Sequence, residues 1–256
     1  MAGSSEGGAG IDPMHQFEVH PIVELPALAG IDTSFTNSSL WMVLAVGLSG
    51  LFLLMASSRS ALVPGRLQLM GEMAYGFVAN MVKENVGTEG MKYFPFIFSL
   101  FMFILFCNML GMLPYSFTVT SHLIVTFALA ATVFLLITGV GFARHGIGFL
   151  KLFVPSGIPA ILLPLLVVIE VISYLTRPVS LSVRLFGNMM AGHTMLKIFG
   201  GFVVGLGSAG LVPLAIAPFV LMVAFTGLEL LIAGLQAYVF TILTCIYLNE
   251  AIHMDH

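Results

Sequence analysis

Ionisable side chains occur inside two long apolar stretches in the C-terminal part of the chain, where a membrane-crossing helix is expected to carry few. They are Glu170, Arg177, Arg184, His193, Lys197 and Glu229. A charged group at mid-bilayer costs about 2.5 to 3.5 kcal/mol on insertion scales, so such residues are rarely kept without a role. Imidazole and carboxylate groups can exchange protons near neutral pH, whereas a guanidinium stays protonated. The residue types therefore predict proton movement through a membrane beside a fixed positive charge.

The spacing of these residues predicts more than one polar surface. Glu170, Arg177 and Arg184 are seven residues apart, which returns each of them to nearly the same face of a helix. Asn188 follows one turn beyond Arg184. His193 lies nine residues from Arg184, so it falls on roughly the opposite face.

On the last apolar stretch, Glu229 and Gln236 repeat the seven-residue interval. The alternative interpretation of all these charges is that they form neutralising pairs, such as Glu170 with Arg177, which only hold helices together. Arg184 has no acidic residue three or four positions away, so pairing within its own helix does not account for it.

The composition places the chain in the membrane class. Hydrophobic residues make up 59% of the sequence and charged residues 8%, which leaves too few polar groups to cover a soluble protein. A crossing needs about 20 apolar residues. The apolar runs predict an all-α integral membrane fold with five transmembrane helices, at about 38–58, 93–113, 121–143, 158–204 and 208–250. The last two exceed a perpendicular crossing, so we expect them to be strongly tilted or bent.

Local signals mark the ends and bends of these segments. A tail of residues 1–32 precedes a single membrane domain of residues 33–256, and the first span is predicted to be capped by Asn37 and Ser38. Prolines cannot continue a helix, so a break is expected near Pro114. The fourth span is expected to be kinked, because it contains three prolines: Pro159, Pro164 and Pro178.

Residues 66–86 show a different pattern, with apolar and polar side chains on opposite sides of a helix. We expect this amphipathic helix to lie flat on the bilayer surface. An ordinary cytoplasmic loop helix is the alternative, because amphipathicity alone does not establish lipid contact.

The positions of the basic residues predict the orientation. The loops expected to face the cytoplasm contain Arg59, Arg66, Lys83, Lys92, Arg144 and Lys151. Five crossings then put the N-terminus outside and the C-terminus inside. The first 32 residues contain no Lys or Arg, so we expect no cleaved targeting segment.

Several classes of site are not indicated. The net charge of −3 provides no basic field for nucleic acid, and no glycine-rich segment ends in Gly-Lys-Ser/Thr, so no nucleotide site is expected. Cys107 and Cys245 have no Cys or His at metal-ligand spacing. We interpret both cysteines as packing residues and expect neither a metal nor a cofactor.

Small residues on the last apolar stretch, Gly227, Ala233, Gly234 and Ala237, would permit close approach of another helix. Such a face is equally consistent with packing inside one chain and with contact to a second protein.

Three segments together resemble the a subunit of F-type ATP synthases. They are Arg177 to His193, the run beginning at Leu235-Gln236, and Gly111 to His122. The resemblance covers most of the chain from about Trp41 onward. Many bacterial members have an acid at the position of His193 and a histidine at that of Glu229. This chain has the two exchanged and is similar in this respect to mitochondrial and alphaproteobacterial members.

This resemblance implies a stationary proton-channel subunit that is not an enzyme on its own. Its Arg184 would face a rotating ring of c subunits, with Asn188 and Gln236 in accessory positions. The resemblance also implies b-type peripheral stalk subunits and membrane lipid as partners, without direct nucleotide binding. The implied location is a bacterial inner membrane, with a mitochondrial inner membrane as the alternative.

The implied mechanism uses two half-channels. Protons would enter from outside near His193 and Glu229 and neutralise a ring carboxylate. They would leave by a second half-channel, for which Glu170 and Ser173 are the candidates. Two alternatives belong to other classes: a stand-alone proton-coupled carrier, and a structural anchor whose charges only hold helices together. A carrier predicts an internal repeat, and none is found between the halves of the sequence.

Overall fold

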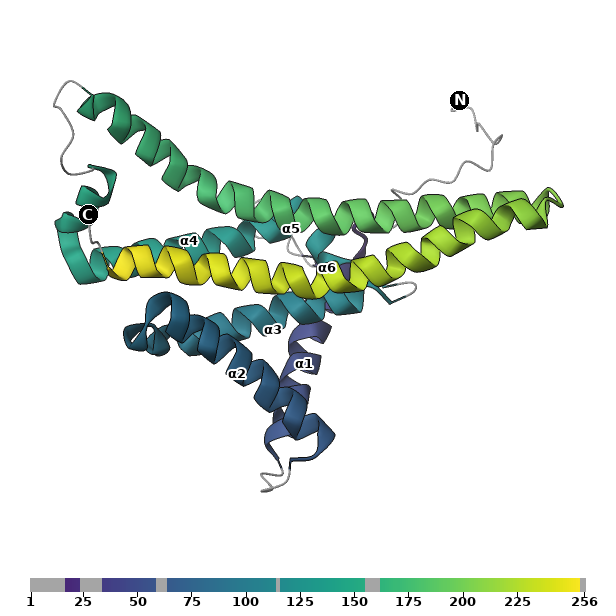
Figure 1. Cartoon of the computed structure of the whole chain (residues 1–256), viewed down its shortest axis with the longest axis horizontal. Helices are drawn as coiled ribbons and strands as arrows, with labels where there is room; N and C mark the ends of the chain where they lie inside the picture. Colours follow the sequence, from purple (N-terminus) through teal and green to yellow (C-terminus); the bar gives the residue numbers. More distant parts are fainter. Residues whose placement is uncertain (1–16, 24–33, 59–63, 114–115, 155–161, 254–256) are drawn as a thin grey trace.

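The computed structural model describes residues 17–23, 34–58, 64–113, 116–154 and 162–253. Within these ranges the chain forms the α-helices α1 (Asn37–Ser57), α2 (Arg66–Val86), α3 (Phe94–Gly111), α4 (Leu123–His145), α5 (Leu163–Ser208) and α6 (Val212–Ile252) (Figure 1). Shorter 3₁₀ helices are η2 (Thr88–Tyr93), η3 (Val119–Ser121) and η4 (Gly146–Phe153). Strands β1 (Pro21–Val23) and β2 (Phe35–Thr36) pair antiparallel before α1.

Some sequence-based predictions fall outside the described residues. They concern most of the tail at 1–32, the cytoplasmic Arg59, and the prolines Pro114 and Pro159.

Among the described residues, five helices are long and apolar enough to cross a membrane, namely α1, α3, α4, α5 and α6. Together with α2 they confirm the predicted all-α membrane fold with five spanning helices and one further helix. In α2, Val78 and Val82 are fully buried, whereas Leu67, Met70 and Met73 are exposed. One end of α2 therefore packs into the protein, while its position relative to a bilayer stays a prediction.

The two longest helices run side by side and form an extended arm (Figure 1). Helix α5 has 46 residues and α6 has 41, which correspond to roughly 70 and 60 Å at the rise of an α-helix. Both lengths greatly exceed the ~30 Å of hydrocarbon in a bilayer, so these helices cannot cross perpendicular to it. Gly210, with φ of 76°, permits the tight turn that joins them.

Helix α5 is bent, as predicted, although Pro164 lies in its first turn, where proline is tolerated. Pro178 lies inside the helix and removes the N–H that would bond the carbonyl of Tyr174. Figure 1 shows the N-terminal part of α5 turning away from α6. The two helices are consequently close over the later part of α5 and apart at its start.

The predicted cap of the first span is wrong by one or two positions. Thr36 is the N-cap of α1, and its hydroxyl accepts a hydrogen bond from the backbone N–H of Ser39 at 3.3 Å. Asn37 is instead held by the preceding segment, because its amide nitrogen donates to the carbonyl of Glu18 at 3.0 Å. The pairing of β1 with β2 brings that segment to the start of α1, which local sequence does not reveal.

The core lies where α2 to α6 meet. Fully buried members include Ile97, Ile104, Leu185, Met189 and Phe240. In lipid the association of helices depends on close packing rather than on the hydrophobic effect, so small residues matter at contacts.

The small residues of α6 divide into two groups. Ala233 and Ala237 are fully buried against the protein's own helices. A Cβ added at Gly227 or Gly234 would meet no atom within 4 Å. The alanines therefore serve packing inside the chain, and only the glycines remain open to a partner.

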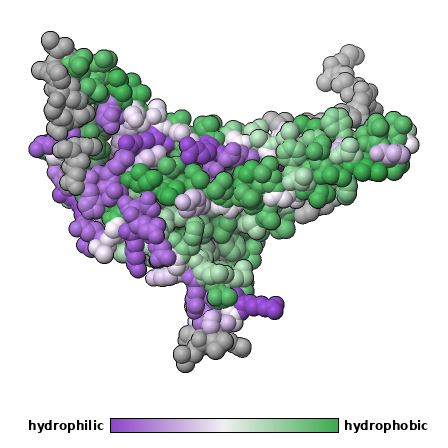
Figure 2. Space-filling view, in the orientation of Figure 1, coloured by the Kyte–Doolittle hydropathy of each residue, from purple (hydrophilic) through white to green (hydrophobic). Residues whose placement is uncertain are grey.

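Figure 2 shows hydrophilic residues gathered toward the end of the molecule where α6 ends, while hydrophobic residues cover much of the arm of α5 and α6. This separation fits a chain whose arm lies in lipid and whose C-terminal end meets water.

Candidate functional site

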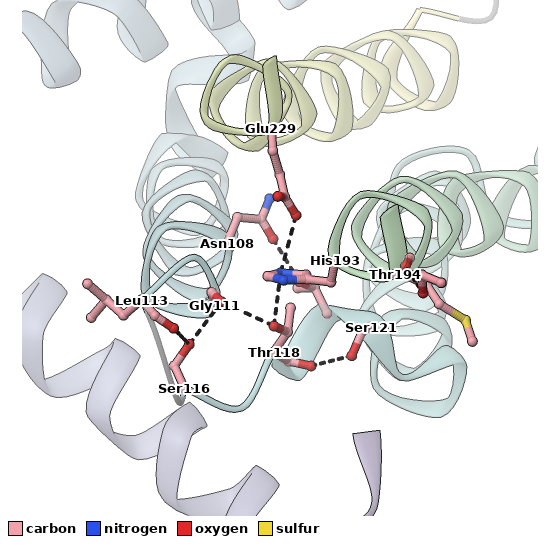
Figure 3. Close-up of polar contacts among 11 residues, drawn as sticks. Asn108, Gly111, Leu113, Ser116, Thr118, Ser121, His193, Thr194 and Glu229 are labelled. Carbon is pink, nitrogen blue, oxygen red and sulfur yellow. Dashed lines mark hydrogen bonds and ion pairs between the residues drawn. The ribbon is translucent and has the colours of Figure 1, made fainter. Parts of the chain in front are cut away.

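His193 and Glu229 form the centre of a polar cluster between α5 and α6 (Figure 3). His193 Nε2 lies 3.4 Å from Glu229 Oε1. Glu229 is only 3% exposed, and neither of its carboxylate oxygens makes a hydrogen bond within the described part of the chain. A buried carboxylate with this little compensation gains strongly from a proton or from a cationic neighbour. The pair is therefore suited to hold and pass a proton.

The segment between α3 and α4 completes this cluster. Thr118 Oγ1 lies 3.0 Å from His193 Nε2 and 3.3 Å from the carbonyl oxygen of Gly111 (Figure 3). His193 thus contacts groups from two other parts of the chain.

Asn108 of α3 links the same region to α6. Its amide nitrogen donates to the carbonyl of Ala233 at 3.2 Å, and its Oδ1 accepts from the Thr120 hydroxyl at 2.9 Å. Asn108 is fully buried. Both bonds fix the loop before α4 against α6, close to the side chains of Glu229 and His193 (Figure 3).

Sequence reasoning did not select Asn108 or Thr118 as functional residues. Asn108 carried a usable signal, because an amide in a long uncharged apolar run must find a partner in lipid. Thr118 carried none of its own, since it is one of four Ser or Thr residues between Gly111 and His122 and the sequence does not distinguish among them.

Arg184 occupies a different surface of α5. Its side chain is exposed and makes no hydrogen bond or ion pair within the described residues, whereas the neighbouring Leu185 is fully buried. One turn further, Asn188 donates to Gln236 Oε1 at 3.0 Å. The Asn188–Gln236 hydrogen bond joins α5 to α6 beside Arg184 and leaves the guanidinium free to meet a group outside the chain.

The predicted separation of Arg184 and His193 is found in the structure. Arg184 faces outward, while His193 faces Thr118 and Glu229. Nine residues along a helix correspond to about 13 Å, which is too far for direct proton transfer.

The hypothesis that Glu170 neutralises Arg177 is wrong in this structure. Arg177 pairs with Glu250 near the end of α6, and its guanidinium lies 5.2 Å from the ring centre of Tyr174 and 4.8 Å from that of Tyr247. Glu170 sits two turns from Arg177 along α5, about 10 Å away, so α6 supplies the closer carboxylate.

Glu170 and Ser173 lie in the part of α5 that turns away from α6. Glu170 is partly buried and Ser173 is exposed. No salt bridge of Glu170 is found within the described residues. The structure does not bring these two side chains together with Arg184, His193 or Glu229.

Among the described residues, no group of three or more His, Cys, Asp or Glu side chains is placed to hold a metal ion. Lys197 is partly buried one turn beyond His193 and adds a positive charge to that end of the cluster.

The fold and these side chains define a multi-pass helical membrane protein with ionisable groups between and upon its two longest helices. Residues 39–249 match the family model described as ATP synthase A chain. The chain is 58% identical to ATP synthase subunit a of Parvibaculum lavamentivorans, over 98% of this chain and 96% of the relative. It is also 58% identical to ATP synthase subunit a of Pelagibacter ubique, over 96% and 99% of the two chains.

A third relative, ATP synthase subunit a of Rhizobium rhizogenes, is 58% identical over 94% of this chain and 97% of its own length. The chain therefore belongs to the ATP synthase A chain family.

Proposed function

We propose that this chain is the stationary proton-channel subunit in the membrane sector of a rotary ATP synthase. It provides two half-channels and an arginine, Arg184, that faces the carboxylates of a c-subunit ring. The chain is non-catalytic on its own and binds no nucleotide; b-type peripheral stalk subunits hold it stationary.

The observation that carries this proposal is the exposed, unpaired Arg184 on an apolar surface. A guanidinium within the hydrocarbon layer costs about 2.5 to 3.5 kcal/mol on insertion scales, unless an anion neutralises it. Val183, next to it in the sequence, and Val179, five residues earlier, are exposed and apolar. A rotor surface that is apolar except for one carboxylate per subunit complements this surface of α5.

The inlet half-channel is assigned to His193 and Glu229. Their contact lets a proton arriving from outside rest on either group before it reaches a ring carboxylate. A neutral carboxylic acid can then move through lipid, whereas a charged one would pay a prohibitive desolvation cost.

The outlet half-channel is assigned to Glu170 and Ser173, where the start of α5 departs from α6. Arg184 lies between the two half-channels and favours the ionised form of a ring carboxylate, which releases its proton toward the outlet. Because a guanidinium does not deprotonate, Arg184 also blocks direct proton leakage. Each proton that moves down 100 mV contributes about 2.3 kcal/mol to ATP synthesis.

The proposed location is a bacterial inner membrane, with the N-terminus periplasmic and the C-terminus cytoplasmic. Lys83 lies in the last turn of α2 and Lys92 in η2, whereas Arg144 lies in the last turn of α4 and Lys151 in η4. These basic loops support a cytoplasmic face at that end. The relatives named above are bacterial, which favours this location over a mitochondrial inner membrane.

Replacing Arg184 by Ala tests the proposal. We expect proton-driven ATP synthesis by the assembled complex to fall about a hundredfold or more, because one preorganised charge is lost. Arg66→Ala, at the exposed start of α2, is the matched control and should leave synthesis near the wild-type rate. Normal coupled synthesis by the Arg184→Ala complex in sealed vesicles would overturn the proposal.

A further inference from the structure

We propose that Thr118 is a positioning residue for His193, whose hydroxyl keeps Nε2 hydrogen-bonded both before and after a proton passes to Glu229. This inference rests on the proposed function of the His193–Glu229 pair. It adds the residue that orients the imidazole and follows its change of protonation.

Thr118 is held between an acceptor that cannot donate and a ring that can do both. The carbonyl of Gly111 lies 3.3 Å from Thr118 Oγ1 and accepts its O–H. With that proton committed, Oγ1 can only accept from His193 Nε2, at 3.0 Å. This arrangement assigns the imidazole proton to Nε2, the nitrogen that lies 3.4 Å from Glu229 Oε1.

Proton transfer then requires one small rearrangement. A proton that arrives at Nδ1 makes the ring an imidazolium, and the Nε2 proton then leaves for Glu229 Oε1. The neutral ring keeps the Nδ1 proton, and its bare Nε2 becomes an acceptor. The Thr118 hydroxyl rotates from the Gly111 carbonyl to donate to Nε2, and rotation of a single side-chain bond takes only picoseconds to nanoseconds. Ser116 Oγ lies 2.9 Å from the same carbonyl and 2.7 Å from that of Leu113, so it can donate to the Gly111 carbonyl after Thr118 has turned away. The Leu113 carbonyl still accepts from the backbone N–H of Ser116 at 3.1 Å. No polar atom in this set loses its last partner.

The backbone around Thr118 is fixed so that its hydroxyl stays in place. The carbonyl of Thr118 accepts from the Ser121 hydroxyl at 2.6 Å. Two residues on, the Thr120 hydroxyl donates to Asn108, which is itself tied to α6. Thr118 is 4% exposed, so water does not readily replace its hydroxyl.

Gly111 leaves the space that Thr118 occupies. A Cβ at position 111 would lie 2.8 Å from Thr118 Cγ2 and 3.0 Å from its Oγ1. Any larger residue at this position would push the hydroxyl away from the carbonyl or toward the imidazole. The close approach of these two residues is therefore part of the same arrangement.

The bonding of Thr118 differs from that of threonines with a packing role. Thr241 and Thr244 are also buried, and each donates to the carbonyl four residues earlier in its own helix. Such a bond occupies the hydroxyl locally. Thr118 instead reaches a titratable ring that is 75 residues away in the sequence.

The test compares Thr118→Val with Thr118→Ser in the intact complex. Val keeps the shape of Thr but has no hydroxyl, so we expect proton-driven ATP synthesis to fall about tenfold, the effect of one lost buried hydrogen bond. Ser restores the hydroxyl, so its rate should lie within about twofold of wild type. Thr132→Val, at an exposed position in α4, should match wild type.

Two results would overturn this inference: an unchanged rate in Thr118→Val, or an equal loss in Val and Ser, which would show a packing role. If Thr118→Val does not assemble, Thr118→Ala and Thr118→Ser differ from each other only by the hydroxyl and supply the same comparison. Arg184→Ala is measured alongside. If the Arg184→Ala complex still synthesises ATP normally, the proposed function is rejected. If the Arg184→Ala complex is inactive but the Thr118→Val complex works at the wild-type rate, only the role of Thr118 is rejected.

Discussion

At the scale of single residues, the cluster around His193 depends on where side chains are missing as much as on where they are present. Gly192 precedes His193, and a Cβ built on it would lie 2.8 Å from Glu229 Oε1 and 3.0 Å from its carboxyl carbon. The carboxyl group, which ends a flexible side chain, would have to shift beside a larger residue there. Gly192 therefore permits the approach that brings Glu229 to 3.4 Å from His193.

Gly192→Ala is expected to displace the Glu229 carboxylate and to lower proton-driven synthesis about ten- to a hundredfold, the usual cost of moving a reacting group by about 1 Å. Gly205→Ala, on the same helix and with nothing within 4 Å of the added Cβ, is the control. The measurement is the rate of proton-driven ATP synthesis by each of the two assembled complexes in vesicles. Equal rates would show that the Glu229 carboxylate can shift without slowing ATP synthesis.

At the scale of elements, two polar interactions hold α5 against α6, one on either side of Arg184. On one side Arg177 pairs with Glu250 between two tyrosine rings, and on the other Asn188 bonds Gln236. Together these two interactions set the register of the two helices. They therefore also set the direction in which Arg184 points.

The ion pair between Arg177 and Glu250 is expected to contribute measurably to stability. Its side chain is 18% exposed and lies near two aromatic rings, so Arg177→Gln should lower the stability of the complex by about 1 to 2 kcal/mol. Arg144→Gln breaks a more exposed Arg–Glu pair, with Glu89, and should change the melting temperature little. Thermal melting of the purified complexes compares them, and a larger effect at Arg144 would contradict this ranking.

At the scale of the whole molecule, polar residues gather at one end and apolar residues cover the arm, which predicts a defined orientation (Figure 2). The turn at Ser208 carries no basic residue, whereas Lys151 lies in a basic segment. Basic loops stay in the cytoplasm. Ser208 is therefore expected to face the periplasm and Lys151 the cytoplasm.

Single cysteines at these two positions test the orientation with a membrane-impermeant thiol reagent. Ser208→Cys should be labelled from the periplasmic side and Lys151→Cys only in inverted vesicles. Cys107 and Cys245 are both buried, which keeps the background low. Labelling of the two sites from the opposite sides would reverse the proposed topology.

Sequence alone was sufficient to predict the five apolar helices, the amphipathic segment and the division between Arg184 and His193. Apolar runs, helical spacing and prolines are properties of neighbouring residues, so no knowledge of tertiary contacts is needed to interpret them. The family resemblance, confirmed by comparison, likewise depends on contiguous segments such as Arg177 to His193.

Only the tertiary structure decided which polar groups meet. Glu250 lies 73 residues from Arg177, and Thr118 lies 75 residues from His193, so their pairing depends on how α5 packs against its neighbours. The same holds for Asn108, whose partner Ala233 is a backbone group that no sequence motif marks. Helix spacing determines the face on which a side chain lies, but helix packing determines what that face contacts.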